Sequence, residues 1–108
     1  MIDPGVEAEL EALRAEYRAD LRPKVESLEA LRGSLAAGAA PASGMQELYR
    51  GLHSIAGSAK TFGLPEVSEA ARAAERFLEP HCAAGAPPPD WAGLRRLIEA
   101  LGALTRRT

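Results

Sequence analysis

Apolar residues recur at helical spacing along the chain, in segments separated by proline, glycine and alanine-rich stretches. Within each segment they stand three or four positions apart, which places them on one face of an α-helix. No stretch shows the alternation of polar and apolar residues, rich in β-branched side chains, that is typical of a strand. The pattern therefore predicts an all-α fold.

Two helices are expected in the first part of the chain, with Pro23 between them. Asp3 and Pro4 match an N-cap followed by proline at the first helical position, which predicts a short helix over about residues 4–18. Proline has no N–H and disfavours helical geometry at the residue before it, so a second helix is expected over about 21–37. The apolar stripe of this second helix is Leu21, Val25, Leu28, Leu31 and Leu35.

A third helix follows an alanine-rich loop. Ser43 and Gln46 have the spacing of a capping box, so we expect this helix to begin near Gly44. It should run to about Phe62, because Gly63 is well suited to a left-handed helix stop.

Two further helices complete the expected fold. Pro65 and Glu66 open a fourth helix, and Asp90 caps a fifth after a proline-rich loop. Their apolar positions are Val67, Ala71, Ala74 and Leu78, then Trp91, Leu94, Leu97, Leu101 and Leu104. Short connections favour antiparallel neighbours. We therefore expect an antiparallel up-down four-helix bundle with a short additional N-terminal helix across one end.

Composition limits the classes of function. The 108 residues, 46% of them hydrophobic, suffice for one modest core, so residues 1–108 are expected to form a single domain. A net charge of −2 with interleaved signs, and only 5% aromatic residues, argue against nucleic-acid binding. There is neither a membrane-length apolar run nor a signal region, and one cysteine cannot form an internal disulfide, so we expect a cytoplasmic protein. Adjacent His81 and Cys82 are too few ligands for a zinc site and are expected to be structural or incidental.

The third helix carries the most informative residue, His53. The apolar stripe of this helix is Met45, Leu48, Leu52, Ile55 and Ala59. At about 100° per residue, His53 lies roughly 120° from the centre of that stripe, and so off the core. Gly57, one turn further on, leaves space for another protein to approach the imidazole, while Lys60 and Arg50 could reach an anion bound there. An isolated histidine on a helix surface can equally be an ordinary surface residue.

The stretch LHSIAGSAKTFGL resembles the signature of histidine-containing phosphotransfer (HPt) domains, and is similar to the phosphotransfer domain of chemotaxis histidine kinases. The matching positions are His53, Ile55, Gly57, Ser58, Ala59, Phe62 and Gly63. The helices before and after this stretch resemble their counterparts in the family, so the resemblance covers most of the chain. It implies a four-helix-bundle module of a phosphorelay.

The resemblance assigns roles residue by residue. His53 falls on the phosphorylated histidine, and Glu75 on a glutamate that hydrogen-bonds the imidazole from the next helix. Arg72 falls on a second polar partner. Many family members have lysine three positions after the histidine, where this chain has Ala56, and the sequence leaves open whether Lys60, one turn further on, replaces that charge. Receiver docking is assigned to Tyr49, Arg50, Ser54, Ala56 and Gly57.

The resemblance also implies the reaction. Nε2 of the histidine would take the phosphoryl group from an aspartyl phosphate on a response-regulator receiver domain and pass it on reversibly. A hybrid histidine kinase is the other expected partner. The protein is expected to be a monomer, with no bound cofactor or metal of its own, because Mg²⁺ would sit on the receiver. No kinase ATP-binding region fits in the chain, so a phosphotransfer intermediate without kinase activity is expected, and Met1 before a capped helix favours a free-standing protein.

Simpler interpretations stay open for these residues. The chain could be a helical interaction module that docks on a signalling partner without being phosphorylated. Glu75 could be a solvated carboxylate at a helix edge, and Lys60 and Arg72 ordinary surface charges. Tyr49 could pack on a neighbouring helix instead of meeting a partner. A separate hydrolase activity is disfavoured, because no second nucleophile or metal-ligand cluster accompanies His53.

Overall fold

The computed structural model describes residues 3–106 and contains, within that range, helices and no strand. The elements are α1 (Pro4–Ala36), α2 (Ser43–Thr61), α3 (Pro65–Leu78), the short 3-10 helix η1 (Glu79–His81) and α4 (Trp91–Thr105). The expected all-α class is confirmed. Along the described part of the chain, no helix combines the length and the apolar content needed to cross a bilayer.

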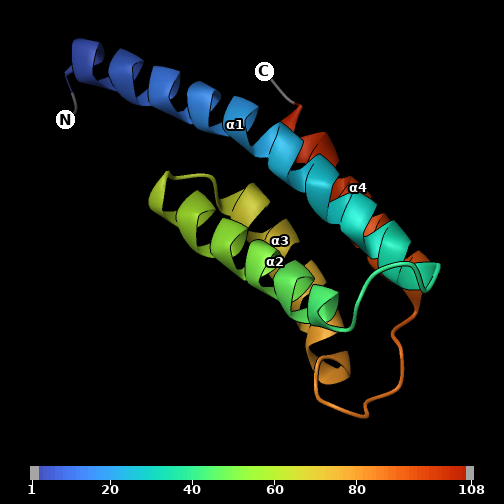
Figure 1. The fold of residues 1–108 in the computed structure, drawn as a ribbon. Helices are drawn as coiled ribbons and strands as arrows, with labels where there is room; N and C mark the ends of the chain where they lie inside the picture. The colour runs from blue at the N-terminus through green and yellow to red at the C-terminus, as the bar shows by residue number, and fades with distance from the viewer. Residues whose placement is uncertain (1–2, 107–108) are drawn as a thin grey trace.

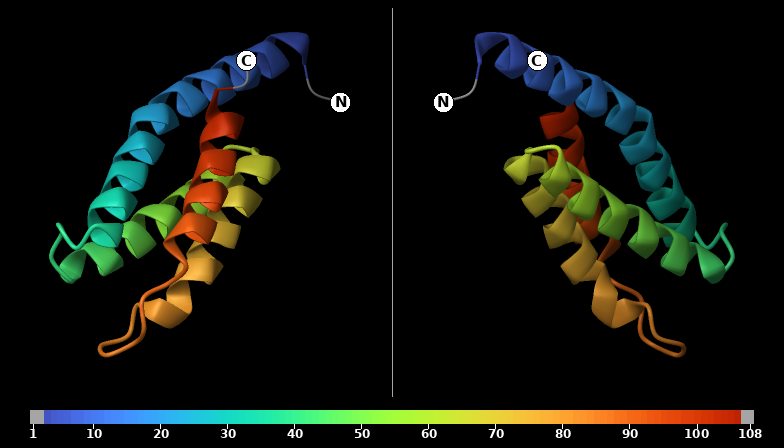
Figure 2. Two further views of the ribbon diagram at one scale, coloured as in Figure 1. Left: turned by 90° about the vertical axis from the view of Figure 1, so that its right-hand side faces the viewer. Right: turned by 90° about the vertical axis from the view of Figure 1, so that its left-hand side faces the viewer.

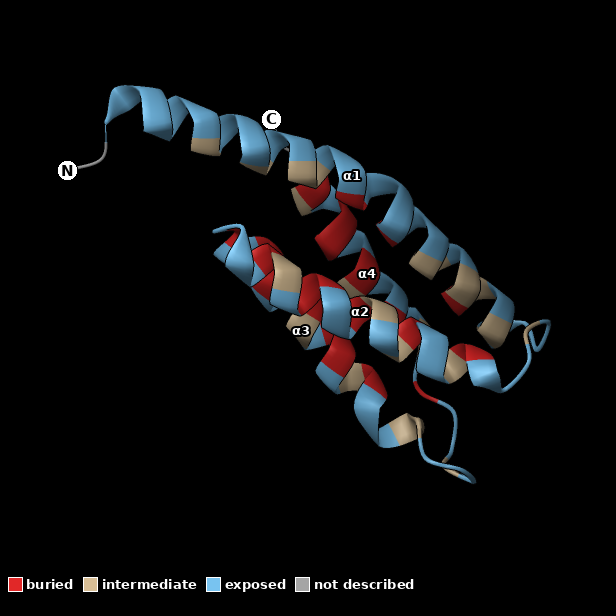
Figure 3. Ribbon diagram, turned by 60° about the vertical axis from the view of Figure 1, so that its left-hand side comes forward, coloured by how far each residue is buried: buried red, intermediate tan, exposed pale blue. Residues whose placement is uncertain are grey.

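The helices pack side by side in a bundle in which α1 and α3 each contact both α2 and α4 (Figure 1, Figure 2). The molecule measures 53 × 20 × 20 Å. This elongation comes from α1, whose 33 residues correspond to about 50 Å of helix. The amino-terminal part of α1 projects past the other helices and is mostly exposed (Figure 3).

The helix break expected at Pro23 is wrong, because α1 runs without interruption through it. A proline inside a helix costs about 3 kcal/mol. Leu21 and Val25, on either side, are only 1% and 4% exposed, and burying such side chains contributes about 1.5–3 kcal/mol each. In addition, Arg22 Nε donates to the backbone oxygen of Thr105 at 3.0 Å. Tertiary contacts thus outweigh the local cost, and the separate N-terminal helix is instead the first part of α1.

The core lies between the four helices and consists mainly of leucine and alanine. Its members are Leu21, Val25, Leu48, Leu52, Ile55, Ala56, Ala59, Leu64, Val67, Ala71, Ala74, Leu78, Leu94, Ile98 and Leu101. Gly51 lets α2 approach α1 closely, since a Cβ atom there would lie 2.5 Å from Cδ2 of Leu28. The buried apolar residues of α2 set the face that this helix turns toward the core, and hence the face that it turns outward.

The ends of α2 bear out one expectation and correct another. Gly63 adopts a left-handed conformation (φ 73°), and its N–H donates to the oxygen of Lys60 at 3.1 Å, so it ends the helix as expected. The expected capping box is wrong: Ser43 is already helical, and no side chain caps the helix. Gln46 instead donates from Nε2 to the oxygen of Cys82 at 3.2 Å and ties α2 to the residue after η1.

Candidate functional site

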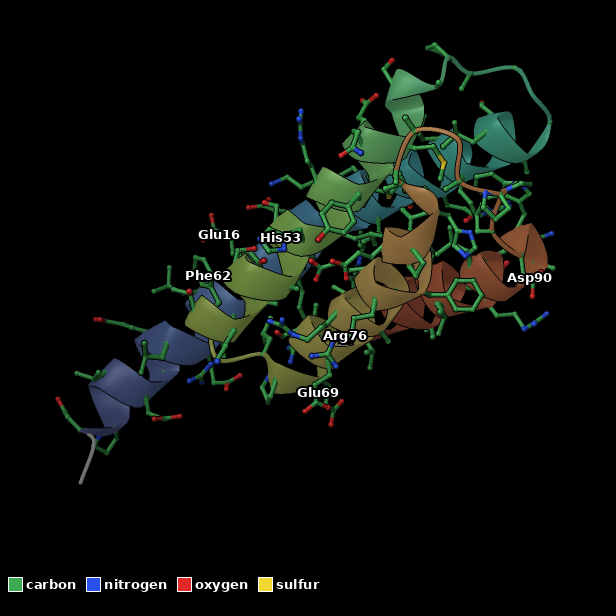
Figure 4. The ribbon with its side chains drawn as sticks, turned by 90° about the horizontal axis from the view of Figure 1, so that it is seen from below. Glu16, His53, Phe62, Glu69, Arg76 and Asp90 are labelled. Carbon is green, nitrogen blue, oxygen red and sulfur yellow. The ribbon has the colours of Figure 1, made fainter. Side chains whose placement is uncertain are left out.

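His53 lies in the middle of α2 and points away from the core, as its position in the sequence predicts. Its side chain is 68% exposed, whereas Leu52 and Ile55 beside it are buried. In Figure 4 the imidazole lies on the outer side of α2, with Glu16 of α1 and Phe62 on one flank and Arg76 of α3 on the other. The imidazole is therefore accessible to another protein.

Glu75 of α3 meets His53 directly. Its Oε2 atom lies 2.5 Å from Nδ1 of the imidazole, while its side chain is only 8% exposed. The alternative of a solvated helix-edge carboxylate is therefore wrong. Because a carboxylate can only accept, Nδ1 carries the proton in this contact. The lone pair of the neutral ring is then on Nε2, the nitrogen that the contact with Glu75 leaves free.

Tyr49 stands one turn before His53 on α2. The two rings are nearly parallel, with centroids 6.2 Å apart and planes inclined by 12°. The pKa of the Tyr49 phenol is raised mainly by desolvation, and next by the negative charges of Glu79 and Glu75. Tyr49 therefore stays a neutral phenol at cellular pH. It is partly buried and packs against the core, as the alternative of packing within the bundle predicts, and its role in receiver docking stays a prediction.

The contact between α2 and α3 forms an antiparallel seam, which explains the burial of Ala56. The pairs His53–Glu75 and Gln46–Cys82 mark its register, and the Ser68 hydroxyl donates to the oxygen of Ala56 at 2.6 Å. Ala56 is only 1% exposed. Its assignment to the docking surface is therefore wrong, because the third position after His53 faces α3 in this register.

The other docking candidates lie on the exterior. Arg50, Ser54 and Gly57 are all exposed. A Cβ atom on Gly57 would have nothing within 4 Å apart from its own helix backbone, which agrees with the clearance inferred from the sequence. Ser54 lies toward α1, where it lines a separate hollow with Lys24.

A basic hollow lies farther along the same seam. It has a volume of about 620 Å³ and is lined by Lys60 of α2 and by α3 residues that include Arg72 and Arg76, with Glu69 as its carboxylate. Lys60 is seven residues after His53, which puts it on the same face of α2 but about 10 Å along the axis. Arg76 was missed from the sequence, although its position one turn after Arg72 could have indicated it.

The opposite flank of His53 is apolar. Tyr17 of α1 stacks on Phe62, with ring centroids 4.3 Å apart and planes 11° apart. The hydroxyls of Tyr17 and Ser58 are hydrogen-bonded. Phe62 is nevertheless 40% exposed, so an apolar ring is accessible near the carboxyl end of α2.

His81 and Cys82 lie at the far end of the seam and make local backbone contacts. His81 Nδ1 is 2.9 Å from the oxygen of Pro87, and the Cys82 thiol donates to the oxygen of Leu78 at 3.5 Å. Burial raises the pKa of the Cys82 thiol. Among the residues that the structure describes, no three His, Cys, Asp or Glu side chains are grouped so that they could hold a metal ion.

Comparison with known proteins agrees with this geometry. The family model described as Hpt domain matches residues 6–107, nearly the whole chain. Searches of curated proteins and of solved structures returned no significant match. The matched range includes all of α2 and α3, and so the seam on which His53 and Glu75 meet. The chain therefore belongs to the Hpt domain family, the histidine phosphotransfer modules of phosphorelays.

Proposed function

We propose that this protein carries a phosphoryl group on His53 between receiver domains of a phosphorelay. The observation that carries the proposal is the 2.5 Å contact between Nδ1 of an exposed imidazole and the buried carboxylate of Glu75. A buried carboxylate is costly unless it is paired. Here the buried carboxylate of Glu75 is paired with the exposed imidazole of His53. This pairing holds the histidine in a fixed orientation at the surface, where another molecule can reach it.

Each bond change follows from that orientation. The Nε2 lone pair of His53 attacks the phosphorus of an aspartyl phosphate on the receiver. An N–P bond forms as the acyl O–P bond breaks, and the aspartate carboxylate leaves with the bonding electrons. Nδ1 keeps its proton, so the ring becomes positively charged, and Glu75 offsets that charge in the transition state. Glu75 acts as a positioning residue, since it touches the imidazole and not the phosphorus.

Neutralisation of the phosphoryl charge falls mainly to the partner. The receiver's Mg²⁺ and lysine would contact the phosphoryl oxygens, as phosphoryl transfer needs positioning and charge compensation. Lys60, two helical turns from His53, is too far along α2 to take the place of a lysine three residues away. Lys60 therefore adds positive potential near the site without direct contact, and Arg72, on α3 one turn before Glu75, adds further positive charge.

The receiver would dock over the exposed part of α2 around His53. Gly57 gives its backbone room to approach, Tyr49 lies beside the imidazole, and Arg50 and Ser54 are exposed on the same helix. A response-regulator receiver and a hybrid histidine kinase are the proposed partners of a monomeric protein.

Incubation with a receiver domain that carries labelled aspartyl phosphate tests the proposal. Label should appear on the wild type in an acid-labile, alkali-stable form, and the His53→Gln variant should stay unlabelled. Transfer that survives this substitution would contradict the role of His53. Binding of the receiver without any transfer would instead favour a docking module that is not phosphorylated.

A further inference from the structure

We propose that Lys60, Arg72 and Arg76 form a docking site for acidic side chains of the receiver, separate from the reacting imidazole. The inference rests on the proposed function, because it concerns the partner that approaches His53. The three cations line one hollow of about 620 Å³, in which Glu69 is the carboxylate. The hollow is large enough to admit side chains of another protein.

The side chains of these three cations are unpaired in the part of the chain that the structure describes. Across residues 3–106, neither a side-chain hydrogen bond nor a salt bridge engages Lys60, Arg72 or Arg76. Arg14, Arg32 and Arg95, in contrast, are paired with glutamates on the same molecule. The positive charge of the hollow is therefore available for an external anion.

The position of the hollow points to fixed charges on the partner. Lys60, at the α2 side of the hollow, is about 10 Å along the helix from His53, so a phosphoryl group on Nε2 lies too far away to engage all three cations. Gly57 lies between them and leaves the surface open. A protein seated over His53 would therefore extend across Gly57 and bring its own side chains to the three cations.

Carboxylates are the expected chemistry of those side chains. Aspartate and glutamate are the side chains of an unmodified protein that are fully ionised as anions at cellular pH, so three unpaired cations complement carboxylates that lie outside the receiver's own Mg²⁺ site. The basic hollow therefore selects a receiver with acidic side chains beside its reactive face. Complementary charge at the rim of an interface mainly speeds association and selects partners.

Charge reversal in the hollow tests the inference, with the receiver that transfers fastest to the wild type as the probe. Arg76→Glu should lower the second-order rate of transfer about tenfold at low ionic strength, and added salt should shrink the difference. Arg96→Glu, at an exposed position of α4, is the matched control and should stay within about twofold of the wild type. Lys60→Glu repeats the test from the other helix, should Arg76→Glu fail to fold.

A binding measurement separates this inference from the proposed function. In the His53→Gln background, which cannot accept phosphate, Arg76→Glu should still weaken receiver binding about tenfold at low salt. Equal affinity with Arg76→Glu and Arg96→Glu would overturn the docking site even if His53 carries phosphate. Wild-type protein that binds the receiver through the hollow but never accepts phosphate would uphold the docking site and contradict the proposed function.

Discussion

Replacing Glu75 by glutamine should slow phosphoryl transfer while leaving the fold intact. The substitution keeps the size of the side chain and removes the negative charge 2.5 Å from Nδ1. A hydrogen bond to a charged group contributes about 1.5–3 kcal/mol. Because the imidazole is 68% exposed, solvent screening reduces this to about 1–2 kcal/mol in the transition state, or about a 5- to 30-fold lower rate.

Rapid-quench measurement of transfer from a phosphorylated receiver gives that rate. Glu79→Gln is the control, because it removes a nearby exposed carboxylate that does not contact the imidazole. The control should transfer within about twofold of the wild type. A Glu75→Gln rate equal to that of the control would refute the reasoning.

Nitrogen NMR of the imidazole supplies a second readout that a purely structural role would not move. The neutral ring of the wild type should carry its proton on Nδ1, and Glu75→Leu should shift the proton toward Nε2. Glu75→Leu should not lower stability, since replacing a buried charge by an apolar side chain is often neutral or stabilising. A wild-type ring protonated on Nε2 would contradict the assigned orientation.

Three further substitutions test the roles of backbone and packing. Gly57→Leu should block transfer, because the leucine side chain would fill the space through which the receiver approaches His53. The melting temperature should stay the same or rise, because the position is open and a helical glycine costs about 1 kcal/mol. Transfer at the wild-type rate would show that this space is not needed for docking. Gly51→Ala should change the free energy of unfolding by less than about 1 kcal/mol in urea titrations, because the gain of about 1 kcal/mol in helix propensity offsets the shift of the Leu28 side chain, whose Cδ2 would lie 2.5 Å from the new Cβ. A loss of about 3 kcal/mol would show that Leu28 cannot move aside. Pro23→Ala should raise that free energy by about 2 kcal/mol, and a loss would mean that Pro23 has a role beyond its backbone cost.

The helical pattern was predictable because local rules and the core agree on it. The apolar stripes of α2, α3 and α4 became the core faces, and Gly63 ended α2. The prediction of a break at Pro23 was wrong because it considered only the local backbone cost of proline in a helix. The burial of Leu21 and Val25 stabilises α1 through contacts with other helices. The sequence near Pro23 does not show how large that stabilisation is.

Within the site, too, features of one helix were predictable and features that depend on packing between helices were not. The period of α2 placed His53 outside the core, and the family resemblance pointed to Glu75. The burial of Ala56 depends on how α2 and α3 slide past each other, which is set by contacts such as that between Ser68 and Ala56. The position of Arg76 in the hollow also depends on how α2 and α3 are aligned. The burial of Ala56 and the role of Arg76 therefore could not be predicted from the pattern of a single helix.

The most direct test of the account identifies the nitrogen of His53 that bears phosphate after transfer. Phosphorus–proton correlation NMR on the phosphorylated protein distinguishes the two ring nitrogens through their couplings to the ring protons. The account predicts phosphate on Nε2, with Nδ1 still facing Glu75. Phosphate on Nδ1, or on another residue, would contradict it.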